Sequence, residues 1–241
     1  MEISLDNFLD GKIKIYQPKN GYRAGLDAIL LASSLKVFNK CKILDIGSGT
    51  GVISLFIASK YKNVEIVGIE KNFKYYSLSK KSLKINKLKS KIKFLHKDFK
   101  SIVNMKSDII VSNPPWFKKN STYKSKNSLL NDAKIESIKL DLWIKKVLIN
   151  LNSKGEYYTI FPYRRIKEII NILKIHFKSV EVYPLSSFKN KPPDKAIIFA
   201  KRSGKECSCH EYDSIIIHKK DKRFMKNIDD ILKKGNSLSL A

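Results

Sequence analysis

A short apolar run that ends in a glycine-rich turn and passes directly into a helical pattern constrains the fold of this chain most. Residues 42–51 are KILDIGSGTG, and residues 52–60 are VISLFIASK. The first run predicts a buried strand over 42–46, and the second predicts a helix over 52–60. Glycines in the turn permit positive φ angles and let a ligand approach the backbone closely. The segment therefore predicts the strand–turn–helix unit that opens a nucleotide-binding α/β fold.

The same alternation of strands and helices continues through most of the sequence. We expect further strands over 12–17, 64–69, 92–96, 108–112, 155–161, 180–184 and 195–200, and helices over 26–38, 72–87, 141–151 and 164–174. Repeated alternation is typical of a mainly parallel sheet covered by helices on both faces. The last two strands lie close together in sequence, which favours a hairpin and one antiparallel strand. We therefore predict an α/β, doubly wound architecture.

Three acidic residues lie at or just beyond the ends of the predicted strands that would surround the glycine turn. Asp45 precedes a G-x-G-x-G pattern, which differs from the G-x-G-x-x-G of dinucleotide-binding folds, and its carboxylate suits an ammonium group or a ribose. Glu70 ends the next strand, 19 residues beyond Gly51, where it can accept hydrogen bonds from two ribose hydroxyls. Asp98 could bind an adenine amino group while Phe99 packs beside the ring. Each acid taken alone is also compatible with a solvated loop carboxylate.

The predicted strand over 108–112 stops at the turn Asn113-Pro114-Pro115-Trp116. Two prolines cannot continue a parallel strand, so the chain must turn at the carboxyl end, where open α/β sheets build their ligand sites. The turn offers an amide, a carbonyl before a donor-less proline and an indole face. Together these groups suit a planar ring that carries an exocyclic amino group. An ordinary Pro-rich turn is the alternative interpretation.

These motifs, in this order, resemble the class I S-adenosylmethionine-dependent methyltransferases. The resemblance rests on Asp45-x-Gly47-x-Gly49-x-Gly51, Glu70, Asp98-Phe99 and Asn113-Pro114-Pro115-Trp116. Enzymes with such a turn methylate planar nitrogens, either in adenine or in the glutamine amide of release factors. The segment over 17–32 (QPKNGYRAGLDAILLA) is similar to the family of tRNA (adenine-N6) methyltransferases that modify the adenine next to the anticodon of valine tRNA. Residues 131–136, 161–165 and 192–200 extend this similarity, which covers about 3–231.

The resemblance implies a fold, a cofactor and sets of site residues. The fold is a seven-stranded Rossmann-like methyltransferase sheet in a single domain over 1–241, with an N-terminal segment over 1–40, a catalytic core over 41–202 and a C-terminal extension over 203–241. The cofactor is S-adenosylmethionine, and the residues implied to bind it are Arg23, Asp27, Asp45, Gly47, Ser48, Gly49, Gly51, Glu70, Lys71, Asp98, Phe99 and Asn113. The implied catalytic residues are Asn113, Pro114, Pro115 and Trp116, and the expected substrate-binding residues are Trp116, Phe117, Lys118, Lys119, Arg164 and Arg165.

In the expected reaction the enzyme mainly aligns an amino nitrogen with a methyl group that is already electrophilic. The Asn113 side chain and the Pro114 carbonyl would accept hydrogen bonds from the amine, and Trp116, with Phe117, would stack on the base. The family most often has tyrosine where this chain has Trp116, so stacking is retained but the polar contacts differ. Residues 117–131 are polar and rich in lysine, which fits a substrate clamp or a disordered insertion equally well.

The net charge of +26 favours a polyanionic partner. The chain has 48 Lys and Arg residues against 22 Asp and Glu residues, and basic side chains bind phosphates whatever the sequence. Only five of the basic residues are arginine, so AT-rich coding explains the choice of lysine. It does not explain the excess of bases over acids. We therefore expect a tRNA as the partner.

Length and composition favour one globular domain. At 241 residues and 43% hydrophobic content, the chain can bury a sizeable core. No apolar run approaches the roughly 18 residues of a membrane span, and the first residues lack a signal-peptide pattern. Cys41, Cys207 and Cys209 are an odd number, which is typical of reduced thiols, and Cys207-Ser-Cys209-His210 lacks a second ligand pair at zinc spacing. We expect a cytoplasmic monomer without a metal ion.

Three other functions compete with tRNA methylation. DNA adenine methyltransferases share the catalytic turn but usually carry a sizeable target-recognition insertion, which is not evident here. Release-factor glutamine methyltransferases have a helical domain before the cofactor core, whereas only about 40 residues precede Cys41. An RNA-binding module without enzymatic activity would not need the glycine turn and the Asn-Pro-Pro turn together.

Overall fold

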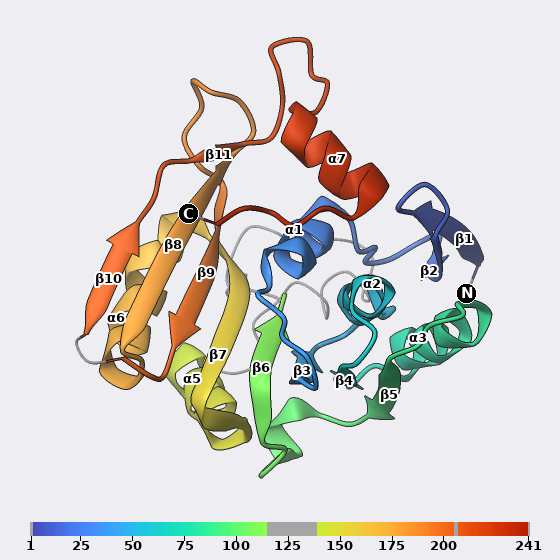
Figure 1. Ribbon diagram of the computed structural model, residues 1–241, viewed down its shortest axis with the longest axis horizontal. Helices are drawn as coiled ribbons and strands as arrows, with labels where there is room; N and C mark the ends of the chain where they lie inside the picture. Colours follow the sequence, from blue (N-terminus) through green and yellow to red (C-terminus); the bar gives the residue numbers. More distant parts are fainter. Residues whose placement is uncertain (1, 115–138, 205–206, 241) are drawn as a thin grey trace.

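A central sheet with helices on both faces organises the chain (Figure 1). The computed structural model describes residues 2–114, 139–204 and 207–240. The strands of the sheet are β3 (Lys42–Ile46), β4 (Glu65–Glu70), β5 (Lys91–His96), β6 (Ser107–Ser112), β7 (Leu151–Pro162), β8 (Ser179–Ser186), β9 (Lys195–Lys201), β10 (Ser208–Glu211) and β11 (Ile215–Ile216). A separate hairpin is formed by β1 (Ile3–Phe8) and β2 (Ile13–Pro18).

Six α-helices and two short 3-10 helices connect or cover these strands in the described part of the chain. The α-helices are α1 (Leu26–Ser34), α2 (Val52–Lys60), α3 (Phe73–Ile85), α5 (Leu140–Asn150), α6 (Ile166–His176) and α7 (Lys226–Lys234). The 3-10 helices are η1 (Phe99–Ser101) and η2 (Tyr163–Arg165). The alternation of strands and helices predicted from the sequence is therefore confirmed.

The sheet is mainly parallel and contains one reversed strand. Its order is β10-β8-β9-β7-β6-β3-β4-β5, and β11 pairs with β8. Only β9, among the described strands of this sheet, runs antiparallel to its neighbours, and it lies between β7 and β8. All seven strands expected for this sheet are present, the strand expected over 12–17 is β2 of the separate hairpin, and β8 and β9 form the expected antiparallel pair. The structure adds β10 and β11, which pair in parallel with β8 and widen the sheet.

Two hydrophobic layers cover the two faces of the sheet. One layer contains α1 and α2 together with sheet residues such as Ile43 and Val111. The other contains α5 and α6 together with Leu44 and Ile110. Neighbouring residues of β3 and β6 therefore point to opposite cores, as expected for parallel strands that are buried on both faces.

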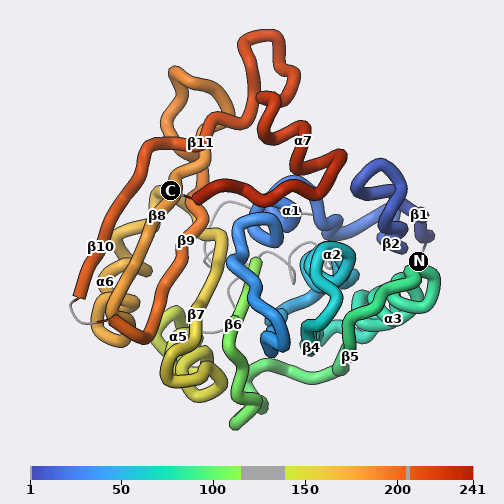
Figure 2. Tube along the Cα trace, viewed as in Figure 1, coloured from blue at the N-terminus to red at the C-terminus, as the bar shows by residue number. Residues whose placement is uncertain are grey.

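The C-terminal extension packs onto the core. Ile217, Ile228, Ile231 and Leu238 are buried in the same hydrophobic layer as α1. Figure 2 shows the last part of the chain running from α7 back across α1 towards the sheet. The sequence patterns predicted no strand or helix there, so β10, β11 and α7 are additions from the structure.

Several predicted boundaries are wrong by a few residues. The helix expected over 26–38 ends at Ser34, because Leu35 adopts an extended conformation. The helix expected from 164 begins at Ile166, and the two residues before it lie in η2. No helix among the described residues is long and apolar enough to cross a membrane.

Candidate active site

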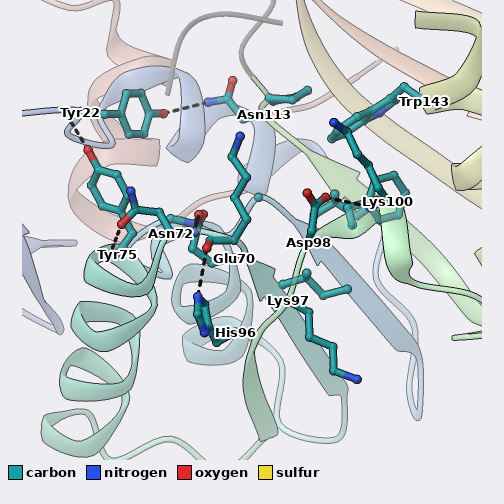
Figure 3. A pocket seen from close by; sticks show the side chains of 17 residues that line it. Tyr22, Glu70, Asn72, Tyr75, His96, Lys97, Asp98, Lys100, Asn113 and Trp143 are labelled. Atoms are coloured by element: carbon teal, nitrogen blue, oxygen red, sulfur yellow. Dashed lines mark hydrogen bonds between the residues drawn. The ribbon is translucent and has the colours of Figure 1, made fainter. Parts of the chain in front are cut away.

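A cavity of about 550 Å³ opens at the carboxyl ends of β3, β4 and β6 (Figure 3). β4 lies on one side of β3 and β6 on the other, so the order of connection reverses at β3. Open α/β sheets bind ligands at such a reversal. The described residues that line the cavity are Tyr22, Ile46, Gly47, Gly49, Ile69, Glu70, Lys71, Asn72, Tyr75, His96, Lys97, Asp98, Phe99, Lys100, Asn113, Pro114 and Trp143.

The glycine turn forms one wall of this cavity. Gly47 and Gly49 have φ angles of +73° and +56°, a region that favours glycine, and a Cβ on either residue would meet no heavy atom within 4 Å. The backbone N–H groups of Gly47 and Ser48 donate to the Ile69 carbonyl at 2.8 and 3.0 Å. The turn is therefore fixed to β4 while its inner surface stays open to a ligand.

Gly51 and Ser48 do not line the cavity. Gly51 has a φ of +88° at the start of α2, and a Cβ there would lie 2.8 Å from the Phe94 ring. The Ser48 hydroxyl is buried and has no hydrogen-bond partner among the described residues.

Asp45 is fully buried at the end of β3. Its Oδ2 accepts a hydrogen bond of 2.7 Å from the Ser54 hydroxyl, whereas Oδ1 has no partner in the described part of the chain. Burial raises the pKa of this carboxyl to about 7, although the bonds from Ser54 act in the opposite direction. Asp45 does not line the cavity, but it is next in the chain to Ile46, which does.

Glu70 joins the glycine turn to the start of α3. One carboxylate oxygen accepts from the Gly49 N–H at 2.9 Å, and the other accepts from the Asn72 N–H at 2.7 Å. Burial raises the Glu70 pKa, and these backbone bonds partly offset that rise. The side chain is therefore held at the cavity wall with a fixed orientation.

Asp98 and Phe99 line the cavity beyond the end of β5. Asp98 caps η1, because its Oδ1 accepts from the Lys100 N–H at 2.9 Å. Phe99 is buried and packs against Trp143, with 4.9 Å between the ring centroids. An aromatic ring and a carboxylate are thus adjacent, two and three residues beyond the end of β5.

Asn113 and Pro114 approach the cavity from the end of β6. The Asn113 amide nitrogen lies 3.5 Å from the Tyr22 hydroxyl, and Figure 3 shows both side chains beside the cavity. Ser112, the preceding residue, is hydrogen-bonded to the buried Tyr157 hydroxyl at 2.8 Å. The same hydroxyl accepts from the Trp143 indole N–H at 3.1 Å. A buried polar network therefore supports the start of the Asn-Pro-Pro turn.

Some residues named from the sequence lie away from this cavity. Arg23 forms an ion pair with Asp6 and donates to the Pro18 carbonyl, so it secures the N-terminal hairpin. Asp27 forms an ion pair with Lys195 of β9. In neither case does the side chain line the cavity, since each is engaged in a contact between elements.

The basic residues expected to bind substrate are only partly described. Arg164 and Arg165 lie in η2 and are not among the lining residues, and Arg165 is ion-paired with Glu168 at 2.7 Å. Pro115, Trp116, Phe117, Lys118 and Lys119 lie outside the described residues, as does the rest of the expected clamp over 117–131.

Besides Lys97 and Lys100, five of the lining residues carry polar or aromatic groups that the sequence patterns did not identify. They are Tyr22, Asn72, Tyr75, His96 and Trp143. Asn72 had a local signal, because an asparagine that follows a strand and precedes a helical pattern is a favoured N-cap, and its side chain accepts from Lys74 N–H at 2.9 Å. The contacts of the other four join segments that are distant in sequence. Within the described residues, no group of three or more His, Cys, Asp or Glu side chains could hold a metal ion.

Known proteins share part of this sequence. Residues 24–138 match the model of the methyltransferase small domain family. A tRNA1(Val) (adenine(37)-N6)-methyltransferase of Pedobacter heparinus is 26% identical over 204 residues, which cover 83% of this chain and 86% of the relative. A protein of the same name from a Flavobacteriaceae bacterium is 27% identical over 153 residues, and the match spans only 64% of its length. A release factor glutamine methyltransferase of Buchnera aphidicola is 29% identical over 185 residues, covering 72% of this chain and 65% of the relative.

Solved structures show the same fold. A predicted O-methyltransferase from Agrobacterium tumefaciens matches 88% of this chain and 98% of its own, with a TM-score of 0.71 and 18% identity. The 16S rRNA N2 G1207 methyltransferase of T. thermophilus, solved with AdoMet and guanosine, matches 84% of this chain and 50% of its own, with a TM-score of 0.58 and 18% identity.

Fold, cavity and sequence similarity together define a class I S-adenosylmethionine-dependent methyltransferase. Within that class the chain resembles the family of tRNA1(Val) (adenine(37)-N6)-methyltransferases. The class, the fold and the cofactor predicted from the sequence are confirmed.

Proposed function

We propose that this enzyme transfers a methyl group from S-adenosylmethionine to the N6 of an adenine in a tRNA anticodon loop, next to the anticodon. The observation that carries the proposal is that Gly47, Glu70 and Asn113 line one cavity. A cofactor held by the glycine turn and Glu70 would lie beside the amide that orients the acceptor amine.

The lining residues suit each part of the cofactor. The open space at Gly47 and Gly49 admits a ligand against the backbone. Glu70 would accept hydrogen bonds from the ribose hydroxyls, and Asp98 with Phe99 would hold the adenine amino group and ring, since all three residues line the cavity. When bound, the cofactor supplies an electrophilic methyl group on a sulfonium.

The residues at the end of β6 then have to orient the acceptor. Asn113 Oδ1 and the Pro114 carbonyl accept hydrogen bonds from the amine, which points the nitrogen lone pair at the methyl carbon. The lone pair forms the new N–C bond, the electrons of the S–C bond pass to sulfur, and a proton leaves the nitrogen for solvent. The two acceptors stabilise the positive charge that develops on nitrogen. The proximity of the Asn113 amide nitrogen to the Tyr22 hydroxyl supports this orientation, because it leaves Oδ1 for the amine.

Charge and similarity support tRNA as the substrate. A net charge of +26 favours a polyanion, and the similarity to tRNA adenine methyltransferases extends over 83% of the chain in the Pedobacter comparison. An anticodon loop also lowers the cost of extruding a base, since its bases are partly unstacked.

Methylation of a release-factor glutamine is the second candidate. It is favoured by the relative from Buchnera aphidicola that is 29% identical over 185 residues. The same acceptor groups would orient a side-chain amide, so the site chemistry alone does not separate the two substrates.

A direct comparison of substrates tests the proposal. Purified enzyme with labelled cofactor is offered unmodified tRNA, duplex DNA and a release factor, and the labelled nucleoside is identified by mass spectrometry. We expect N6-methyladenosine in tRNA. Label only in the release factor or only in DNA would overturn the substrate assignment and leave the cofactor site in place.

A further inference from the structure

Two basic loops project from the same edge of the sheet as the candidate active site. β6 and β7 are parallel, and β9 runs antiparallel to both β7 and β8. β8 therefore has the direction of β6, and so has β11, which is parallel to β8. The loop after β8 and the loop after β11 consequently leave the sheet at the carboxyl edge, and Figure 1 shows both at the top of the molecule.

The two loops are joined to each other. The His218 N–H donates to the Ser187 carbonyl at 3.0 Å, and the rings of Phe188 and His218 lie 5.6 Å apart. His218 also stacks on Phe224 with a centroid distance of 4.8 Å. The His218 ring thus contacts Phe188 of the first loop and Phe224 of the second, and these contacts hold the two loops together.

The tip of the second loop is a tight, ordered hairpin. The N–H of Lys219 donates to the Arg223 carbonyl at 2.8 Å, and the N–H of Lys222 donates to the Lys219 carbonyl at 3.0 Å. Lys222 accordingly has a φ of +67°. The charged side chains of the tip are therefore presented by a backbone of fixed shape.

The charge of these loops is strongly positive and mostly uncompensated. Their exposed basic residues, which we call the basic loop pair, are Lys189, Lys191, Lys219, Lys220, Lys222 and Arg223. Arg223 is paired with Asp221 at 2.6 Å, whereas the three tip lysines form no salt bridge with a described residue. On the neighbouring α7, by contrast, Lys233 and Lys234 are each paired with an aspartate at 2.7 Å. Lysines without acidic partners keep their charge available for an external anion.

We propose that the basic loop pair binds the phosphate backbone of the substrate RNA at a distance from the target base. This inference rests on the proposed function. β8 is three strands away from β6, which at about 4.8 Å per strand is ~15 Å. The contacts are therefore to phosphates of the RNA that flank the target loop. They increase affinity without reading sequence, and they leave the chemistry at Asn113 unchanged.

A pair of matched triple variants tests the inference. In the first, Lys219→Gln, Lys220→Gln and Lys222→Gln remove three charges from the loop tip. In the control, Lys62→Gln, Lys87→Gln and Lys89→Gln remove three exposed charges that precede β4 and β5, at the opposite edge of the sheet. Each protein is titrated with full-length tRNA transcript and with a short single-stranded oligonucleotide that carries the target adenine. Thermal midpoints and cofactor affinities are measured alongside.

For full-length tRNA we expect the loop variant to bind at least about tenfold more weakly than the control. The slope of log K against log salt should also fall by about 0.9 for each phosphate that the variant no longer neutralises. Binding of the short oligonucleotide, cofactor affinity and turnover at saturating tRNA should stay within twofold of wild type.

Equal losses of affinity in the two variants, or equal losses on both RNAs, would overturn the inference. Weaker binding to anionic phospholipid vesicles with unchanged RNA affinity would also overturn it, and would assign the surface to a membrane. Methylation of the tRNA by the wild-type enzyme tests the proposed function separately. If the wild-type enzyme does not methylate tRNA, the proposed function itself is wrong.

Discussion

Glu70 receives backbone N–H groups from two different segments, so its carboxylate is already oriented before any ligand binds. We expect Glu70→Gln to weaken S-adenosylmethionine binding about tenfold or more, because loss of a charged hydrogen bond costs about 1.5–3 kcal/mol. Isothermal titration calorimetry measures the change. Glu65→Gln is the control, since Glu65 is exposed at the opposite end of the same strand. Equal affinities for the two variants would remove Glu70 from the cofactor site.

Asn113 is proposed to hold the acceptor amine and not the cofactor. Asn113→Ala should lower the rate of methyl transfer to tRNA by at least about a hundredfold, the size typical of removing one transition-state hydrogen-bond partner. Cofactor affinity should stay within a few-fold of wild type. Single-turnover assays and calorimetry separate the two effects, with the exposed Asn63→Ala as the control. A large loss of cofactor affinity would instead reassign Asn113 to cofactor binding.

Asp45 gives the folded protein a specific dependence on pH. Burial raises its pKa from 3.8 to about 7, so the folded state holds a proton that the unfolded state has already released. The raised pKa lowers the free energy of unfolding. This loss of stability is absent below about pH 4, grows as pH rises towards 7 and is constant above pH 7. Asp45→Asn removes it, so the thermal midpoint of the variant relative to wild type should rise between pH 4 and pH 7. A difference that is independent of pH would contradict the raised pKa.

Among single residues, the sequence pattern located those site residues that follow a predicted strand closely. Glu70 and Asn113 come directly after a predicted strand, and Asp98 comes two residues after one. Tyr22 could not be placed in the same way, since its contact with Asn113 joins residues 91 positions apart. Arg23 was included through family resemblance, and its ion pair with Asp6 connects it to the N-terminal hairpin instead.

Between elements, Gly68 of β4 leaves room for the Phe94 ring of β5 beside the glycine turn. A Cβ on Gly68 would lie 2.5 Å from the Phe94 ring and 3.0 Å from Ser48 Cβ. We expect Gly68→Ala to destabilise the protein by about 1–3 kcal/mol, because the crowded ring has to shift. Urea unfolding measures the loss. Gly25→Ala is the control, as a Cβ there meets nothing within 4 Å, and an equally stable Gly68 variant would show that the ring can move freely.

The same local reasoning explains which elements the sequence could predict. β6 contains the apolar run Ile109–Val111, and most residues of α2 are apolar, so neighbouring residues alone identify these two elements. All four residues of β10 are exposed, and the strand exists because β8 offers a free edge for pairing. Nothing in its own composition marks it as a strand. The end of α1 was also not predicted correctly, because Leu35 is extended and ends the helix at Ser34.

For the whole molecule, the C-terminal residues contribute to the stability of the catalytic core. Ile231 of α7 is 1% exposed and belongs to the same hydrophobic layer as α1 and α2. Ile231→Ala should cost about 2–5 kcal/mol and lower the midpoint of a single unfolding transition. Ile175→Ala deletes the same atoms from a residue that is 74% exposed and should change little. A separate early transition in the Ile231 variant would show that the extension unfolds on its own.

The reversed strand β9 has a consequence for how such an enzyme changes over evolutionary time. β9 pairs with β7 over Glu156–Pro162 and also with β8. The loop that joins β8 to β9 therefore begins and ends at strands whose pairing is fixed. Insertions or deletions in that loop alter the outer surface without moving a covering helix or the glycine turn. An ancestral gene could therefore acquire a new macromolecular target through the length of one hairpin connection, while inheriting its methyl-transfer chemistry intact.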